Sequence, residues 1–168
     1  VYVVNELSGS VTRFIRREPG KLERRETVPT LPASFSGEST CAEIAVSPDG
    51  RFVYASNRGH DSIAVFRVEA GAAAGDAASE SAGTSGNSIE PSASERESGA
   101  LVPAGHVSTR GRTPRNFAIT PDGAWMIAAN QDTDNLVVFR MDPVSGLPIY
   151  HGVEVPVSKP VCVRIRPL

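Results

Sequence analysis

The chain has 168 residues and a formal net charge of −2, from 17 lysines and arginines against 19 aspartates and glutamates. This near-neutral balance argues against nucleic acid or an anionic membrane surface as the main partner. Two cysteines and three scattered histidines provide neither a disulfide framework nor metal-ligand spacing, so we expect no metal and no cofactor. No apolar run approaches the roughly 20 residues that a membrane span needs.

The predicted elements are short strands separated by polar turns. Residues 1–4 are expected to form a strand, and no long segment has the period of a helix. Further along the chain we expect strands at about 41–47, 52–56, 63–68, 101–107, 115–120, 124–130, 135–140, 149–155 and 160–167. The first strand begins at the first residue, and nothing follows the last strand to pair with it. We therefore expect the chain to be part of a larger protein, with a processed mature domain as the alternative.

An internal repeat organises these strands. The Pro-Asp-Gly triplet at 48–50 recurs at 121–123, an offset of 73 residues. Residues 114–121 align with 160–167 at an offset of 46 residues, which we take as the true period. The triplet predicts a tight turn, because Pro presets φ and Gly accepts a positive φ.

An insertion explains why the offset of 73 residues is longer than the period of 46 residues. Residues 70–99 are almost all small or polar, and Ile89 is their single large apolar residue. Such a segment cannot bury enough surface to offset the entropy of ordering, so we predict a disordered low-complexity insertion.

Residues 2–14 form a third copy of the part of the repeat that spans 54–66.

A period near 46 residues with four strands in each copy is the signature of a β-propeller blade. Each blade buries both faces against its neighbours, which explains strands that are apolar on both sides. We therefore predict an all-β fold, a partial β-propeller with about three four-stranded blades. The approximate blades are 1–40, 41–112 and 113–159, followed by the first strand of a further blade over 160–168.

Propeller geometry brings certain polar residues together. The first strand of each blade lines the central channel, and its start opens at the same end as the loop between the second and third strands. The residues expected at this end are Glu6, Glu43, Arg58, His60, Arg115, Asn116 and Gln131. This set of carboxylates, guanidinium groups, amides and one imidazole suits acid–base chemistry and anion binding, although ordinary ion pairing around a wet channel is the alternative.

Residues that break the repeat are more informative than those that keep it. One aligned position holds Glu6, Arg58 and Gln131, and another holds Glu43 and Asn116. A purely structural position would tend to keep one residue type, so these differences favour function. An Asn recurs in all three loops, where we expect it to satisfy backbone groups.

Two segments resemble the seven-bladed lactonase family, which includes propeller-type 6-phosphogluconolactonases and fungal carboxy-cis,cis-muconate cyclases. They are 42–66, with its Asn-Arg-Gly-His-Asp-Ser loop, and 114–123, with Pro-Arg-Asn-Phe. The resemblance implies a seven-bladed ring of which this chain is the C-terminal part, so catalytic residues from earlier blades would be absent. It also implies an enzyme that hydrolyses or forms a lactone ring on a small anionic acid.

The family's proposed site uses Glu, Arg and His residues at one end of the channel. The predicted catalytic residues are accordingly Glu43, His60 and Arg115. Glu43 would act as general base with His60 as the alternative, and Arg115 would stabilise an oxyanion or hold a substrate anion. The predicted substrate-binding residues are Arg58, Asn116, Gln131 and Glu6.

Other functions stay open alongside a sugar-acid lactonase. The same groups would serve a muconate cyclase, and a non-catalytic propeller that binds proteins is a further alternative. A protein-binding scaffold tends to expose aromatic patches, whereas aromatic residues make up 6% of this chain and lie mostly in strands. Because no targeting segment is visible, we expect a cytoplasmic location.

Overall fold

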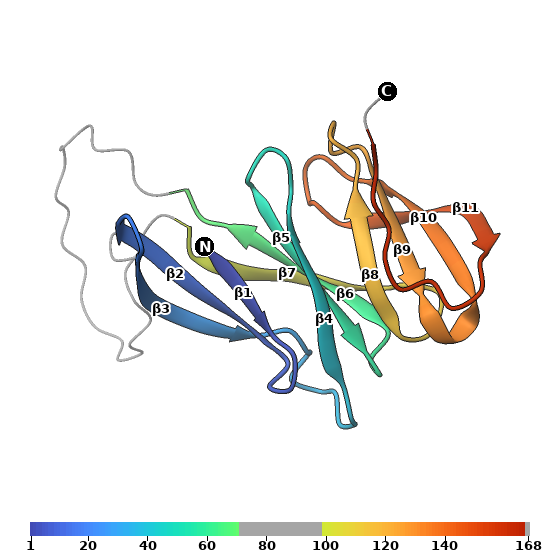
Figure 1. The fold of residues 1–168 in the computed structure, drawn as a ribbon, viewed down its shortest axis with the longest axis horizontal. Helices are drawn as coiled ribbons and strands as arrows, with labels where there is room; N and C mark the ends of the chain where they lie inside the picture. Colours follow the sequence, from blue (N-terminus) through green and yellow to red (C-terminus); the bar gives the residue numbers. More distant parts are fainter. Residues whose placement is uncertain (71–98, 167–168) are drawn as a thin grey trace, which may run out of the picture.

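The fold is built from β-strands throughout the described part of the chain. The computed structural model describes residues 1–70 and 99–166, which contain eleven strands and one 3-10 helix, η1 (Gln131–Thr133). The strands form three antiparallel sheets arranged side by side (Figure 1). The predicted all-β fold is therefore confirmed, while residues 71–98 of the predicted insertion lie outside the described residues.

The three sheets follow one another along the chain. The first sheet contains β1 (Tyr2–Asn5), β2 (Ser10–Glu18) and β3 (Lys21–Pro29). The second contains β4 (Thr40–Val46), β5 (Phe52–Arg58), β6 (Ser62–Val68) and β7 (Leu101–Ser108). The third contains β8 (Pro114–Ile119), β9 (Trp125–Asn130), β10 (Asn135–Met141) and β11 (Pro148–Pro156). Each strand of the second and third sheets begins and ends within two residues of its prediction.

The strand predicted at 160–167 is a correction. The described part of this segment has no regular structure, because no described strand forms a ladder with it. Its backbone is held instead by a side chain of β8, since the Val163 N–H donates to Asn116 Oδ1 over 2.7 Å. Just before the segment, the Lys159 N–H donates over 2.8 Å to Oδ1 of Asp134, which precedes β10. The segment thus follows the sheet without joining a ladder.

The second sheet buries both of its faces. Phe52 and Tyr54 of β5 belong to an apolar cluster shared with the third sheet, which includes Phe139. The alternate residues Val53 and Ala55 belong to a second cluster, shared with the first sheet. This double burial explains why β5 is apolar on both sides rather than alternating between apolar and polar residues.

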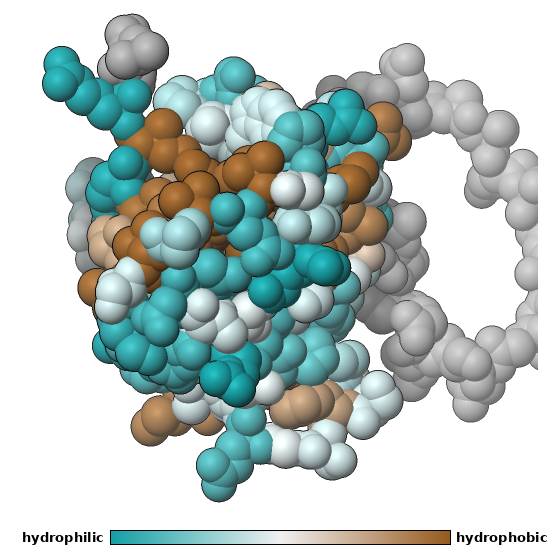
Figure 2. Space-filling view, turned by 90° about the vertical axis from the view of Figure 1, so that its right-hand side faces the viewer, coloured by the Kyte–Doolittle hydropathy of each residue, from teal (hydrophilic) through white to brown (hydrophobic). Residues whose placement is uncertain are grey.

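The outer face of the third sheet carries an apolar patch. Figure 2 shows it as a band of hydrophobic residues at the third-sheet end of the molecule. Exposed apolar side chains on β11 and on the segment after it are Ile149, Val153, Val155, Val157 and Val161. Such a surface matches the face against which a further blade would pack.

None of the described segments forms a helix with the length and apolar character needed to cross a lipid bilayer.

Candidate functional site

The loop after β5 and the start of β8 lie at the same end of the molecule. The Thr113 N–H donates to Asp61 Oδ1 over 2.8 Å, and the Thr109 N–H donates to the Asp61 carbonyl over 3.0 Å. The loop between β1 and β2 reaches the same end, since the Cys41 N–H donates to the Glu6 carbonyl over 2.9 Å. These contacts place the two loops and the starts of β4 and β8 at one end of the molecule.

A β-bulge shapes the start of β4 and the start of β8. The register of β4 against β5 shifts between Cys41 and Ile44, and that of β8 against β9 shifts between Pro114 and Asn116. Both shifts begin at the same position of the repeat, since Cys41 aligns with Pro114. Because a bulge re-aims the side chains beside it, Glu43, which is unpaired in β4, and Asn116, which follows the unpaired Arg115 in β8, can turn toward each other.

Glu43 is a half-buried carboxylate with both oxygens held. Its Oε1 accepts the Ile44 N–H over 3.0 Å, and its Oε2 accepts a hydrogen bond from Asn116 Nδ2. The Glu43 backbone N–H donates to Ser56 Oγ over 3.0 Å. Two adjacent sheets therefore fix the orientation of this carboxylate.

Arg58 and Glu6 pair with each other. Arg58 Nη2 contacts Glu6 Oε1 in an ion pair and donates to the Cys41 carbonyl over 2.9 Å. The Arg58 side chain is 17% exposed whereas that of Glu6 is 61% exposed, so the pair sits at the rim. Arg58 Nε is buried and has no hydrogen-bond partner in the described chain. Arg58 thus links the first sheet to the second.

His60 lies in an aromatic and hydroxyl environment on the loop after β5. Its Nδ1 is 2.6 Å from Ser62 Oγ, and its ring packs edge-on against Phe35 and against His106. Burial, followed by the neighbouring His106, lowers the pKa of His60, so the imidazole is neutral near pH 7. Within residues 1–70 and 99–166, no hydrogen bond or ion pair joins His60 to Glu43.

Arg115 and Gln131 occupy the rim beside this group. Arg115 is exposed on β8, at the extra residue of the bulge, and no ion pair joins it to Glu43 in the described ranges. Gln131 opens η1, and its backbone N–H donates to the Thr113 carbonyl over 3.0 Å. The structure therefore joins Glu43 to Asn116 and Arg58 to Glu6, whereas Arg115 lies at the surface without a hydrogen-bond or ion-pair partner among the described residues.

Two aspartates matter to this end of the molecule and were not predicted. Asp61 and Asp134 both adopt a left-handed backbone with φ of 53°. The Asp61 carboxylate accepts the backbone N–H of Thr113, the residue before β8, and the Asp134 carboxylate accepts that of Lys159, the residue before the 160–167 segment. The recipients of these bonds, Thr113 and Lys159, also correspond in the repeat. Identical residues at one aligned position were the sequence signal for this role.

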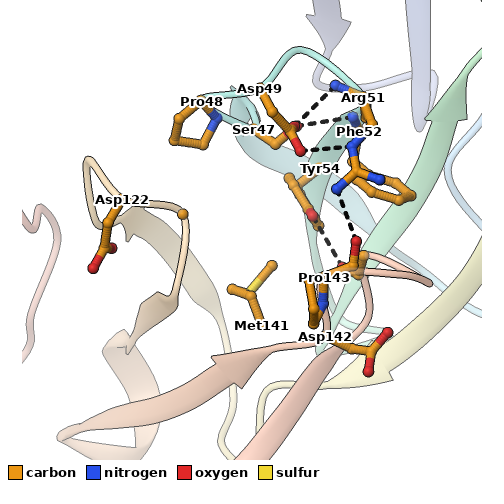
Figure 3. A pocket seen from close by; sticks show the side chains of 12 residues that line it. Ser47, Pro48, Asp49, Arg51, Phe52, Tyr54, Asp122, Met141, Asp142 and Pro143 are labelled. Atoms are coloured by element: carbon orange, nitrogen blue, oxygen red, sulfur yellow. Dashed lines mark hydrogen bonds and ion pairs between the residues drawn. The ribbon is translucent and has the colours of Figure 1, made fainter.

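A separate cavity of about 300 Å³ lies at the opposite end, between the second and third sheets (Figure 3). Its lining comes from the Pro-Asp-Gly turns and the turn after β10. Tyr54 donates to the Gly146 carbonyl over 2.9 Å, and Arg51 Nη2 to the Pro143 carbonyl over 2.8 Å, which closes one side. No predicted site residue lines this cavity.

The chain is similar to known proteins over most of its length. The family model described as "Lactonase, 7-bladed beta-propeller" matches residues 1–84 and 78–165. The 6-phosphogluconolactonase of Bacillus subtilis (strain 168) is 34% identical over 164 residues, which cover 97% of this chain and 40% of that protein. A 6-phosphogluconolactonase of Formosa agariphila is 34% identical over 153 residues, covering 86% of this chain and 34% of that protein.

Solved structures show the same relationship. The periplasmic gluconolactonase PpgL of Pseudomonas aeruginosa aligns with a TM-score of 0.75 at 31% identity, covering 97% of this chain and 38% of that one. A 6-phosphogluconolactonase candidate from Bacteroides uniformis aligns with a TM-score of 0.72 at 34% identity, covering 97% and 39%. The chain thus spans 40% or less of the length of each of these proteins.

Proposed function

The chain belongs to the seven-bladed β-propeller lactonase family, and from this premise we propose that it carries part of the active site of a lactonase. The proposed reaction is hydrolysis of the ring ester of a small anionic sugar-acid lactone, the type of substrate for which the Bacillus subtilis relative is named. The observation that carries the proposal is the half-buried carboxylate of Glu43, held in one orientation by Asn116 and by the Ile44 N–H.

Glu43 is the proposed general base. Its carboxylate takes a proton from a water molecule while the water oxygen attacks the ring carbonyl carbon. The tetrahedral intermediate then collapses with cleavage of the ring C–O bond, and the departing oxygen receives the proton back from Glu43. An oriented carboxylate favours this step because little reorganisation is needed when the substrate binds. His60, with its neutral imidazole, is the alternative base.

Arg115 is the proposed anion-binding group. Its guanidinium is exposed on the strand next to Glu43 and has no carboxylate partner in the described ranges. It is therefore available to hold a substrate phosphate or carboxylate, or a developing oxyanion, by paired hydrogen bonds. Arg58 is a second candidate, but a substrate anion would have to displace Glu6 from it.

Polar side chains at the rim complete the proposed substrate site. Gln131 is half-exposed and offers an amide to sugar hydroxyls, and Glu6 is an exposed acceptor. Asn116 was predicted as a substrate ligand on the same grounds. The proposed partner is a small anionic molecule rather than nucleic acid or a membrane, in line with the net charge of −2.

Turnover assays on the full-length protein test this function. We expect accelerated hydrolysis of a phosphorylated gluconolactone above its spontaneous rate, and weaker hydrolysis of the unphosphorylated ring if Arg115 binds the phosphate. Lactone formation from a carboxymuconate would favour the cyclase alternative. An unaccelerated rate with every lactone would contradict the proposal and would favour a protein-binding propeller.

A cytoplasmic location forms part of the proposal. Cys41 is buried and Cys162 is exposed, and both are free thiols. An exposed free thiol suits a reducing compartment, where disulfide formation is rare. Cell fractionation followed by immunodetection tests this, and recovery in the periplasm or the culture medium would contradict it.

A further inference from the structure

We propose that Asn116 is a positioning residue that fixes the Glu43 carboxylate, and not a ligand of the substrate. The inference rests on the proposed lactonase function, because it assigns Asn116 a role in orienting the proposed base. It changes the role predicted for Asn116 from the repeat, where its polar character at the site end suggested substrate contact.

Burial argues against direct substrate contact. Asn116 is 4% exposed, so its side chain offers almost no surface to a substrate from solvent. Its neighbour Arg115 is exposed at the extra residue of the bulge. The bulge thus sends one side chain outward to where an anion can reach it and the next side chain inward to Glu43.

The contacts of Asn116 determine which way its amide points. Oδ1 accepts the Val163 N–H over 2.7 Å, and Nδ2 donates to Glu43 Oε2. A backbone N–H only donates and an ionised carboxylate only accepts, so the opposite amide orientation would lose both hydrogen bonds. The Val163 backbone therefore sets Asn116, and Asn116 in turn presents an N–H donor to Glu43.

This chain of contacts crosses three successive copies of the repeat. Glu43 and Asn116 occupy the same repeat position, beside the bulges of the second and third sheets, and Val163 lies in the segment that aligns with the start of β8. The orientation of the proposed base consequently depends on residues after β11. The two hydrogen bonds, from Val163 to Asn116 and from Asn116 to Glu43, connect that segment to the proposed base.

Two substitutions separate positioning from the other roles. Asn116→Asp keeps the oxygen that accepts from Val163 but replaces the donor facing Glu43 with an acceptor. We expect N116D and N116A each to lower kcat about 10- to 100-fold with little change in KM, as for a misplaced reacting group. Asn135→Ala is the matched control, because it removes a similar Asn–Glu hydrogen bond, to Glu154, on the outer strands.

The kinetic pattern distinguishes the possible outcomes. A raised KM with unchanged kcat in N116A would show substrate binding and overturn the inference. Full activity in N116D with loss of activity in N116A would show that only the Val163 contact matters, which also overturns it. Glu43→Gln is assayed together with the Asn116 variants. If E43Q keeps full activity, the proposed base is wrong and the positioning role fails with it. If E43Q is inactive while N116D is fully active, only the positioning role fails.

A readout that is independent of catalysis completes the test. Because Asn116 Oδ1 accepts the Val163 N–H, amide hydrogen exchange at Val163 should be at least about tenfold faster in N116A than in the wild type, and nearly unchanged in N116D. Equal exchange in N116A and the wild type would show that this contact does not hold Asn116, and would overturn the inference.

Discussion

The carboxylate of Asp61 accepts the backbone N–H of Thr113 over 2.8 Å, across 52 residues of sequence. This hydrogen bond ties the loop after β5 to the entry of β8 and so brings two parts of the candidate site to one rim. Asp61 Oδ1 also accepts the Gly59 N–H over 3.2 Å. One side chain therefore satisfies two loop backbone donors.

Asp61→Ala should lower the free energy of unfolding by about 1–3 kcal/mol, because two backbone donors lose their acceptor. Asp61→Asn keeps an acceptor oxygen and tolerates the left-handed backbone, so its loss should be smaller. Urea denaturation of both variants checks this. Equal stability of D61A and the wild type would mean that solvent replaces the contact without cost.

Asn57 and Asn130 occupy one repeat position but differ in their bonding. Asn57 Oδ1 accepts from Thr30 Oγ1 over 2.7 Å, and its Nδ2 donates to the Thr30 carbonyl over 2.8 Å. Asn130 Nδ2 donates to the Thr109 carbonyl over 3.0 Å, whereas its Oδ1 has no partner in the described chain. Both side chains thus satisfy backbone groups just after the preceding sheet, as the recurrence of Asn suggested, whereas Asn5 Nδ2 donates to the hydroxyls of Ser10 and Thr12.

We expect Asn57→Ala to destabilise the fold by about 1–2 kcal/mol more than Asn130→Ala, because it leaves more buried polar groups unpaired. Thermal denaturation of the two variants under identical conditions gives the comparison. An N130A protein less stable than N57A would show that the unpaired oxygen of Asn130 has a partner in solution.

Gly146 combines a positive φ of 72° with close approach to the core. A Cβ at this position would lie 2.5 Å from the buried Phe52 ring. Gly20 has a similar φ of 79° and open space around it. Gly20→Ala should therefore cost about 1 kcal/mol for backbone strain alone, whereas Gly146→Ala adds overpacking of about 1–3 kcal/mol. Equal losses on urea denaturation would show that Phe52 yields without cost.

The lowered pKa of His60 predicts a pH dependence with a definite sign. Its folded-state pKa lies below the ordinary 6.5 because of burial first and of His106 second, and Asp61 opposes the shift. The unfolded chain then binds this proton more tightly than the folded chain does. The contribution of neutral His60 to the free energy of unfolding is therefore fully present above pH 6.5. It declines as the pH falls through 6.5 toward the lower folded-state pKa.

Thermal denaturation at several pH values from about 7.5 to about 5 checks the His60 effect. The wild type should lose more stability over this range than His60→Gln, which has no imidazole to protonate. Parallel losses in the two proteins would mean that other groups account for the acid sensitivity.

The strand pattern followed from the sequence because it depends on local periodicity and turn chemistry. Repeated Pro-Asp-Gly turns and matching apolar runs placed the strands of the second and third sheets to within two residues. The terminal strand at 160–167 was wrong, since strand formation also needs a neighbouring ladder. Local patterns cannot supply that partner.

The contacts within the candidate site were less predictable. The repeat placed Glu43 and Asn116 at equivalent positions, but not the hydrogen bond between them, which depends on how two sheets twist past each other. Pairing of Arg58 with Glu6 has the same origin. The shared position of Asp61 and Asp134 was a usable signal, because a structural position tends to keep one residue type in every copy.

The turnover of Glu43→Gln measures the central claim most directly. E43Q keeps the size of the side chain and removes the proton acceptor, so kcat for lactone hydrolysis by the full-length protein should fall about 100-fold or more. Glu154→Gln is the matched control, since Glu154 also accepts from an Asn side chain but lies on β11, and it should keep wild-type kcat. A kcat for E43Q equal to that of E154Q would contradict the assignment of Glu43 as the base.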